Sequence, residues 1–162
     1  MKDDSPHTYS DAMDMALHAL APRARSRAEL HTHLLSRGVD EINAAGVLDS
    51  LELQGLLNDL EFAKLWAQSR QRQKKLSKRV ISSELRQKGV AQDIIDEVLS
   101  AVDDEDEYAM AFALAEKKYR ASSHLADDVI YRRISSLLAR KGFGHQLMAR
   151  IMNQLRLGDE QF

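Results

Sequence analysis

Three stretches of the chain share one pattern: RAELHTHLLSRGV (27–39), KRVISSELRQKGV (78–90) and YRRISSLLARKGF (131–143). Each stretch places apolar residues eight and four positions before a glycine, and a cation directly precedes that glycine. The glycines are Gly38, Gly89 and Gly142, so the pattern recurs after 51 and then 53 residues. Self-similarity at this spacing is typical of repeat architectures. We therefore expect three related structural units.

Apolar residues at helical spacing lie on both sides of each glycine. The residues before the glycines are Leu30 and Leu34, Ile81 and Leu85, and Ile134 and Leu138. A second ladder follows at Val47, Leu48 and Leu51, at Val98, Leu99 and Val102, and at Ile151, Met152 and Leu155. No segment shows the alternation of a half-buried strand. The sequence predicts an all-α fold of three tandem three-helix repeats, elongated, at 10–55, 56–102 and 103–162, after a mobile tail over 1–9.

Capping residues predict where the first helices begin and end. Ser10 is expected to cap a first helix that ends before Pro22, and S-x-x-E at Ser26 predicts a capping box on the second helix. Gly38 ends that helix as a left-handed residue, and Asp40 caps a third helix that runs to Gly55.

The remaining helices follow from the same signals. One helix begins at Asn58, buries a stripe of Phe62, Leu65 and Trp66, and extends into the basic stretch 69–75. The next begins at Ser77 and ends at Gly89, and another covers about 92–102. The third repeat begins in the acidic turn 103–107, which suits a helix N-terminus. The second helix of this repeat is expected to end at Lys141, and the third is expected to cover about 144–157.

Composition narrows the class of protein. The chain has 162 residues, of which 44% are hydrophobic, with seven glycines, two prolines and no cysteine. This is enough to bury a core, and it favours helices over sheet. The absence of cysteine excludes disulfides and thiolate metal sites. No apolar run approaches the roughly 20 residues that a membrane span needs. We expect a cytoplasmic location.

Charge is segregated along the chain. Residues 64–88 hold nine cations against one acid, whereas residues 93–107 hold eight acids and no cation. A dipolar molecule with one face suited to polyanions is expected. The candidate contact residues are Arg23, Arg25, Arg27, Arg37, Arg70, Arg72, Lys74, Lys75, Lys78, Arg79, Arg86 and Lys88.

Several of these residues have a second interpretation. The cations before the three glycines complement the helix macrodipole without any partner. The run Arg23, Arg25, Arg27 is either a solvated edge or a contact surface. Phe62 and Trp66 are interpreted as core residues rather than base-stacking platforms.

No constellation for chemistry is found. The six histidines lack metal-ligand spacing, no P-loop is present, and G-F-G at 142–144 is explained by one helix end and the next helix start. No nucleophile has a base at a meaningful spacing. We therefore expect no enzyme activity, no metal and no cofactor.

Two elements resemble the RecX regulatory proteins, bacterial modulators of the RecA recombinase. The first, R-S-x-x-E-L-x-x-x-L-x-x-x-G, matches ARSRAELHTHLLSRG (24–38), and the second, G-L-L-x-D-x-x-F-A-x-x-W-x-x-x-R, matches residues 55–70. The similarity continues through SSELRQKGV (82–90) and, more loosely, through the third repeat. The chain departs from the family at His33, where relatives often carry Lys, and at Lys74-Lys75, where Gly is common.

The resemblance implies a three-repeat, all-helical protein that lies along the groove of the RecA–DNA filament. We expect the protein to be a monomer. It implies suppression of strand exchange, ATP hydrolysis and co-protease activity, with consequences for DNA repair, recombination and the SOS response. DNA contact is expected to be weak or to occur through RecA. An alternative left open by the residues is a direct DNA-binding protein, because three-helix groups and a basic segment suit phosphates.

Overall fold

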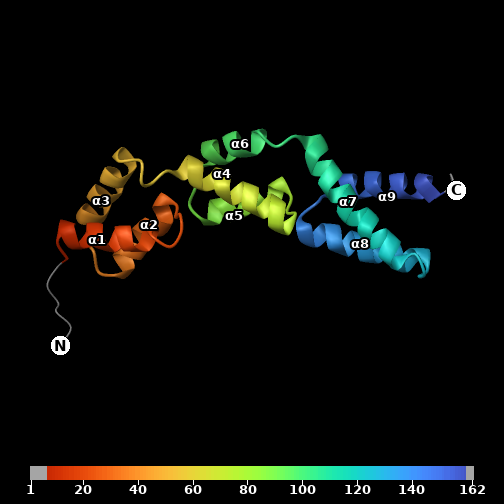
Figure 1. Ribbon diagram of the computed structural model, residues 1–162, viewed down its shortest axis with the longest axis horizontal. Coiled ribbons are helices and arrows are strands. Elements are labelled where there is room, and N and C mark those ends of the chain that lie inside the picture. Colours follow the sequence, from red (N-terminus) through yellow and green to blue (C-terminus); the bar gives the residue numbers. More distant parts are fainter. Residues whose placement is uncertain (1–6, 160–162) are drawn as a thin grey trace, which may run out of the picture. The chain divides into compact units, whose positions relative to one another are not determined.

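The computed structural model describes residues 7–159, and these residues contain helices and no strand (Figure 1). The helices are α1 (Tyr9–Leu20), α2 (Arg27–Ser36), α3 (Glu41–Leu53), α4 (Asp59–Ser69), the π-helical turn η1 (Arg70–Lys74), α5 (Lys78–Gln87), α6 (Gln92–Ser100), α7 (Asp104–Ser122), α8 (Asp127–Lys141) and α9 (His145–Asp159). They form three successive groups, α1–α3, α4–α6 and α7–α9. The predicted all-α class is confirmed.

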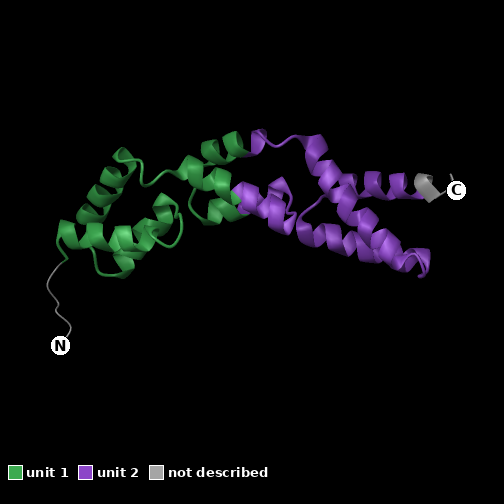
Figure 2. Cartoon of the chain, viewed as in Figure 1, with its two compact units in different colours: residues 1–66, 84–98 green, residues 67–83, 99–162 purple. Residues whose placement is uncertain are grey.

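The chain divides into two compact units (Figure 2). Unit 1 contains residues 1–66 and 84–98, and unit 2 contains residues 67–83 and 99–162. The division falls inside α4, α5 and α6, so the middle group contributes residues to both units. Each unit is described by itself below.

The glycine pattern has the expected backbone basis. Gly38, Gly89 and Gly142 have φ of +87°, +75° and +91°, the left-handed conformation that ends a helix and favours glycine. The predicted apolar positions before them are all fully buried, at 0% exposure. The ladders after Gly38 and Gly142 are buried as well, whereas Leu99 and Val102 of the middle group are only half-buried.

Each unit has its own apolar core. In unit 1, Ala12, Ala16 and Ala19 of α1 pack with the leucines and valines of α2 and α3. In unit 2, Ile130, Ile134 and Leu138 of α8 pack between the apolar faces of α7 and α9. The small alanine side chains allow α1 to lie close to its neighbours.

Three local expectations were wrong. Thr8, not Ser10, caps α1, because Thr8 and Asp11 form a reciprocal capping box that begins the helix at Tyr9. The tail that the sequence predicted over 1–9 therefore overlaps the helix, because Thr8 caps α1 and Tyr9 begins it. Residues 1–6 of that predicted tail lie outside the described part of the chain. Leu65 is 57% exposed and does not share the buried stripe of Phe62. Helix α3 ends at Leu53 and α6 at Ser100, each two residues earlier than expected.

Other caps agree with the sequence. The reciprocal capping box of Ser26 and Glu29 is present, and Asp40 accepts from the backbone of Asn43. Asn58 accepts from the backbone of Glu61, and Asp103 caps α7.

A repeated contact, here named the first joint, lies in unit 1 between the start of α2 and the end of α5. The Ser26 hydroxyl donates to the carbonyl of Lys88, which precedes Gly89. The Arg27 backbone N–H donates to Asp59 of α4 at 2.8 Å. A Cβ built on Gly89 would lie 2.3 Å from Cβ of Ala28, so only glycine permits this approach.

An equivalent contact, the second joint, lies in unit 2 between the start of α5 and the end of α8. The Ser77 hydroxyl donates to the carbonyl of Gly142 at 2.9 Å. The Lys78 backbone N–H donates to Glu107 of α7 at 2.7 Å. A Cβ on Gly142 would lie 2.2 Å from Val80. In both joints, orphan donors and acceptors at helix ends satisfy each other, which explains why Ser26 and Ser77 are buried.

Candidate polyanion-binding surface

The twelve candidate cations divide by what they contact. Several of them are engaged within the protein, and their charged groups are therefore partly neutralised. Others are exposed and have no side-chain polar contact recorded within residues 7–159. The following paragraphs treat the two units separately.

The three arginines at the entrance of α2 are tied to their own unit. Arg23 lies 3.4 Å from Glu29, and Arg25 Nε donates to the carbonyl of Ala19 at 2.8 Å. Arg27 forms ion pairs of 2.7 Å with Asp49 and 2.8 Å with Glu52 of α3. These contacts place Arg27 against α3 and favour a structural role for much of this run.

Lys88 and its neighbours form a packed polar cluster in unit 1. The Lys88 ammonium lies 2.7 Å from Glu29 and 4.9 Å from the centre of the Trp66 ring. The Trp66 indole donates to Glu84 at 2.8 Å and stacks on Phe62, which is buried. These aromatic side chains therefore belong to the packing of unit 1, as the sequence indicated.

Glu29 is the acidic centre of this cluster. Burial by itself raises the pKa of its carboxyl, but hydrogen bonds from Lys88, Arg23 and the Ser26 backbone outweigh burial and leave the pKa below its ordinary value. The carboxylate thus joins the capping box of α2 to Lys88, which follows the last residue of α5.

In unit 2, Lys78 and Arg79 are used by the second joint. Lys78 pairs with Asp104 at 2.6 Å, and the Arg79 guanidinium donates twice to the carbonyl of Gly142 at 3.2 Å. The Lys141 ammonium donates to the carbonyl of Lys74 at 2.7 Å.

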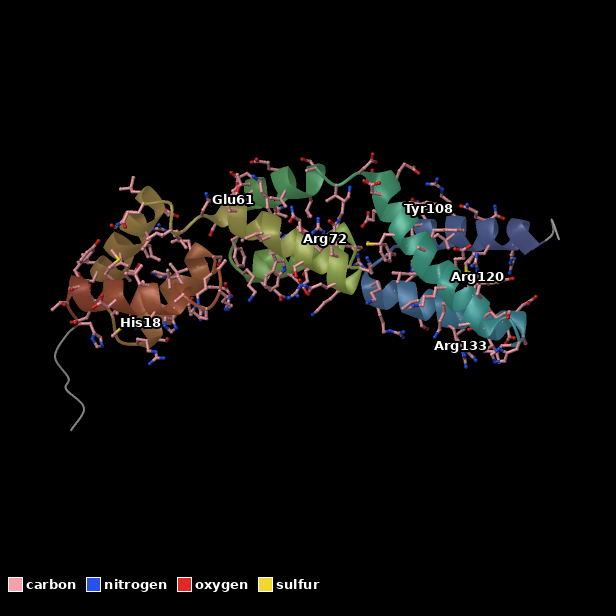
Figure 3. All side chains as sticks on the ribbon, viewed as in Figure 1. His18, Glu61, Arg72, Tyr108, Arg120 and Arg133 are labelled. Atoms are coloured by element: carbon pink, nitrogen blue, oxygen red, sulfur yellow. The ribbon has the colours of Figure 1, made fainter. Side chains whose placement is uncertain are left out.

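The π-helical turn η1 presents the open part of the basic stretch. Arg72, labelled in Figure 3, is exposed, as are Lys74 and Lys75, and none of the three side chains forms a hydrogen bond or ion pair among the described residues. Lys75 ends the turn in a left-handed conformation, with φ of 54° and ψ of 42°. The expected helical extension into 69–75 is thus present, as a wider turn. Such π-helical insertions are frequent at functional sites.

Helix α8 carries cations that the sequence reasoning did not select. Arg132, Arg133 and Arg140 are exposed, and Figure 3 labels Arg133. Arg133 and Arg140 are seven residues apart and therefore share one face of the helix. This spacing is readable in the sequence, but a search for runs of consecutive cations misses it.

Among residues 7–159, no cluster of three or more histidines or acids is arranged to hold a metal ion. No helix within the same residues is both long and apolar enough to cross a membrane.

Comparison with known proteins assigns the groups to a family. The first, second and third three-helix domains of RecX match residues 12–51, 58–99 and 104–152, respectively. The crystal structure of RecX from Lactobacillus salivarius matches with a TM-score of 0.82 and 25% identity, over 92% of this chain and 97% of that chain.

Curated relatives agree with this match. "Regulatory protein RecX" of Mycobacterium avium is 37% identical over 91% of this chain and 86% of its own length. The protein of the same name from Streptomyces coelicolor is 36% identical over 93% of this chain and 85% of its own length. Both relatives are named as regulators rather than as enzymes. With the three-helix groups and joints described above, these matches show that the chain belongs to the RecX family of regulatory proteins.

Proposed function

We propose that this protein binds the RecA–DNA filament and inhibits RecA recombinase, ATPase and co-protease activity, and so modulates DNA repair, recombination and the SOS response. The observation that carries the proposal is family membership over about nine tenths of the chain. The family name implies regulation of RecA. The protein acts in the cytoplasm as a monomer, without catalysis or a cofactor.

The joints support a mechanism in which successive groups contact successive RecA subunits. Each joint ties two groups through hydrogen bonds at helix ends and a close glycine contact. Groups coupled in this way bind as linked modules rather than independently. Bound across neighbouring subunits, it opposes the relative motion or subunit exchange that turnover of the filament requires.

The exposed cations of η1 supply the electrostatic part of binding. Arg72, Lys74 and Lys75 lie within four residues and form no ion pair among residues 7–159, and Arg72 and Lys75 line a pocket whose other side includes Asp106 and Glu107. A concentrated positive charge attracts DNA phosphates or an acidic RecA surface and raises the association rate.

A titration of the protein into RecA, single-stranded DNA and ATP tests the function. We expect the ATPase rate to fall as the protein approaches stoichiometry with RecA. An unchanged rate at stoichiometric protein rejects the proposal.

The role of η1 is tested by replacing Arg72, Lys74 and Lys75 with Glu. Reversal of three exposed charges should weaken inhibition by at least about tenfold, because each phosphate contact contributes to a salt-dependent binding energy. The matched control replaces Arg132, Arg133 and Arg140 of α8 with Glu, which changes net charge equally. Equal loss in both variants means that net charge, not η1, is responsible.

The variant Lys75→Gly distinguishes the effect of Lys75 on folding stability from its effect on binding. Glycine adopts the left-handed conformation without the Cβ clash, so we expect unfolding in urea to require about 1 kcal/mol more free energy. The same change removes one cation and should weaken inhibition slightly. Greater stability together with stronger inhibition would contradict a binding role for Lys75.

The exposed cations of η1 also favour a second candidate, direct binding to DNA. This candidate predicts salt-sensitive fluorescence anisotropy changes with bare DNA at physiological salt. Weak binding to DNA together with tight binding to the RecA filament reduces direct DNA contact to a secondary role.

A further inference from the structure

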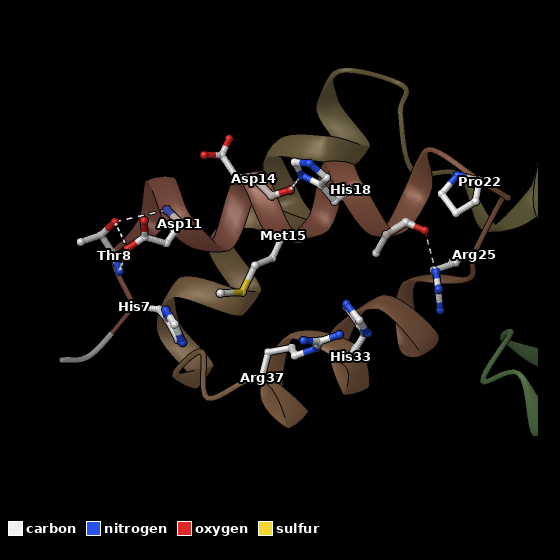
Figure 4. A pocket seen from close by; sticks show the side chains of 11 residues that line it. His7, Thr8, Asp11, Asp14, Met15, His18, Pro22, Arg25, His33 and Arg37 are labelled. Atoms are coloured by element: carbon white, nitrogen blue, oxygen red, sulfur yellow. Dashed lines mark hydrogen bonds between the residues drawn. The ribbon is translucent and has the colours of Figure 1, made fainter. Parts of the chain in front are cut away.

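A pocket of about 840 Å³ opens between α1 and α2 in unit 1 (Figure 4). Met15 and Ala19 of α1 provide apolar lining, and polar side chains surround it. Figure 4 shows His33 and Arg37 rising from α2 toward Met15, with Arg25 at the end of the pocket nearest Pro22. The pocket therefore brings together cations from the loop before α2 and from the end of that helix.

These cations lack an anionic partner among residues 7–159. Arg25 uses Nε on the Ala19 carbonyl, which leaves its two terminal nitrogens for a ligand. Within residues 7–159, the side chains of His33 and Arg37 form no hydrogen bond or ion pair, although the His33 carbonyl accepts from Ser36 and the Arg37 backbone donates to Leu34. Burial, followed by the positive charges of Arg25 and Arg37, lowers the pKa of the His33 imidazole below its ordinary value. An anion between these groups would reverse the effect of those charges.

The acids that line the pocket lie away from the end that holds the cations (Figure 4). Asp11 accepts hydrogen bonds from the Thr8 backbone at 2.9 Å and from its hydroxyl at 2.8 Å, and these bonds lower the pKa of the Asp11 carboxyl. The Asp14 carboxylate points away from the pocket in Figure 4. The end of the pocket that holds Arg25, His33 and Arg37 is therefore electropositive.

The first joint shows how an anion is held between cations elsewhere in unit 1. There, the Glu29 carboxylate lies 2.7 Å from Lys88 and 3.4 Å from Arg23, so an anion sits between two cations. Arg37 occupies the position before its glycine that Lys88 occupies in the second group. Among residues 7–159, Arg37 forms no ion pair with a carboxylate equivalent to Glu29.

We propose that Arg25, His33 and Arg37 form a binding site for a phosphate group. Two guanidinium forks and an imidazole offer more donors than one carboxylate accepts, whereas a phosphate has several acceptor oxygens in a tetrahedral arrangement. The source is either a free phosphate compound or a phosphodiester of nucleic acid. The phosphate site itself does not depend on the proposed function, but the assignment of its ligand to nucleic acid rests on that function.

The site is tested on the full chain by following the His33 ring signals by NMR. Inorganic phosphate should shift these signals saturably and raise the pKa of His33, because a bound anion favours the imidazolium form. The pocket is also lined by other titratable groups, namely His7, Asp11, Asp14 and His18. Their NMR signals are followed in the same titration as internal references. An absence of any saturable shift at His33 overturns the proposal.

Two variants separate the site from general charge. Arg37→Ala removes an exposed side chain and should weaken phosphate binding about tenfold, the loss of roughly one charged hydrogen-bonding partner. Arg133→Ala removes an exposed cation of α8 in unit 2 and should leave binding unchanged. Equal effects of the two variants overturn the proposal. Circular dichroism establishes that both variants are folded.

Competition assigns the source of the phosphate. A short oligothymidylate that displaces inorganic phosphate supports a phosphodiester ligand, and failure to displace it supports a free phosphate compound. A peptide of aspartates that shifts His33 when phosphate does not would overturn the phosphate assignment in favour of a carboxylate. Phosphate binding without inhibition of RecA leaves the site standing and rejects the proposed function, and inhibition without phosphate binding does the reverse.

Discussion

The two joints use the same kind of contact at helix ends but different side-chain charges. The serine hydroxyl donates to the carbonyl of the residue before the glycine in the first joint and to that of the glycine itself in the second. In each, a buried serine caps one helix and donates to a carbonyl at the end of another, beside a left-handed glycine. In the first joint the cation before the glycine, Lys88, meets the Glu29 carboxylate, whereas Lys141 in the second joint meets a backbone carbonyl. Serine and glycine are thus the shared requirement, because backbone groups at helix ends must be satisfied wherever helices meet end to end.

The joints also differ in how the glycine is enclosed. Gly142 is buried and faces the side chains of Val80 and Ser77, which have rotatable bonds. Gly89 is exposed but faces Cβ of Ala28, which is fixed to the backbone. A substitution in the first joint therefore requires backbone movement, whereas the second joint allows some side-chain adjustment.

The largest expected effect is that of Gly89→Ala. The new Cβ would lie 2.3 Å from Ala28, and alanine is strained at φ of +75°. We expect a loss of about 3 kcal/mol or more in the free energy of unfolding, from left-handed strain plus overpacking. Urea unfolding at equilibrium measures it.

Gly38→Ala is the matched control for that experiment. Gly38 has φ of +87°, but the nearest atom to its Cβ would be 3.7 Å away, in the His7 ring. This variant should lose only the left-handed strain, about 1–2 kcal/mol. Ala28→Gly should partly rescue Gly89→Ala by removing the clash. Equal losses at Gly38 and Gly89, with no rescue, would show that the first joint does not enforce the close contact.

An intermediate effect is expected for Glu29→Gln, with a defined pH dependence. The pKa of Glu29 is lower in the folded protein than in the unfolded chain, so its stabilisation is fully present above the unfolded pKa and is lost as pH falls through the folded pKa. At pH 7 we expect the variant to lose about 1–2 kcal/mol, given hydrogen bonds to charged groups. The difference between wild type and variant should shrink below about pH 4.

Urea unfolding at a series of pH values tests the Glu29 prediction. Asp49→Asn is a suitable comparison, because Asp49 is also paired with an arginine but its side chain is 66% exposed. Exposed pairs contribute little, so this variant should change stability by less than about 1 kcal/mol. A difference for Glu29→Gln that stays constant from pH 7 to acid conditions would contradict the role of the carboxylate.

The last comparison sets the joint serines, with an effect similar to that of Glu29, against a smaller effect at the open helix start of α8. Ser26→Ala and Ser77→Ala should each cost about 1–2 kcal/mol, since each removes a helix cap and leaves a carbonyl without its donor. Ala126 holds the corresponding place before α8 and has no side-chain cap. Ala126→Ser should therefore stabilise the protein by about 0.5–1 kcal/mol.

Thermal unfolding of the three serine and alanine variants provides the measurement. Similar losses at Ser26 and Ser77 are expected, because each hydroxyl donates to a carbonyl at the end of another helix. A neutral Ser26→Ala or Ser77→Ala variant would mean that the corresponding hydroxyl is not needed at its joint.

The amino-acid sequence by itself determined the helices, most of their caps and the buried ladders. These features depend on local preferences: apolar spacing at Leu30 and Leu34, the capping box at Ser26, and a left-handed backbone at Gly38 are readable over a few residues. The errors at Ser10 and Leu65 arose where several residues of similar character stood close together, and packing or a reciprocal cap chose between them.

Tertiary structure alone decided which cations are open and what the serines do. The hydroxyl of Ser26 meets a carbonyl 62 residues away and that of Ser77 one 65 residues away, and no local pattern contains such a contact. The sequence predicted Arg27 and Lys78 as candidate contact residues for a partner, but each forms an ion pair with an acid of another helix. Arg37 looks the same along the chain, yet it faces a pocket. The physical reason is that helix formation depends on near neighbours, whereas neutralisation of a charge depends on whatever the fold brings within about 4 Å.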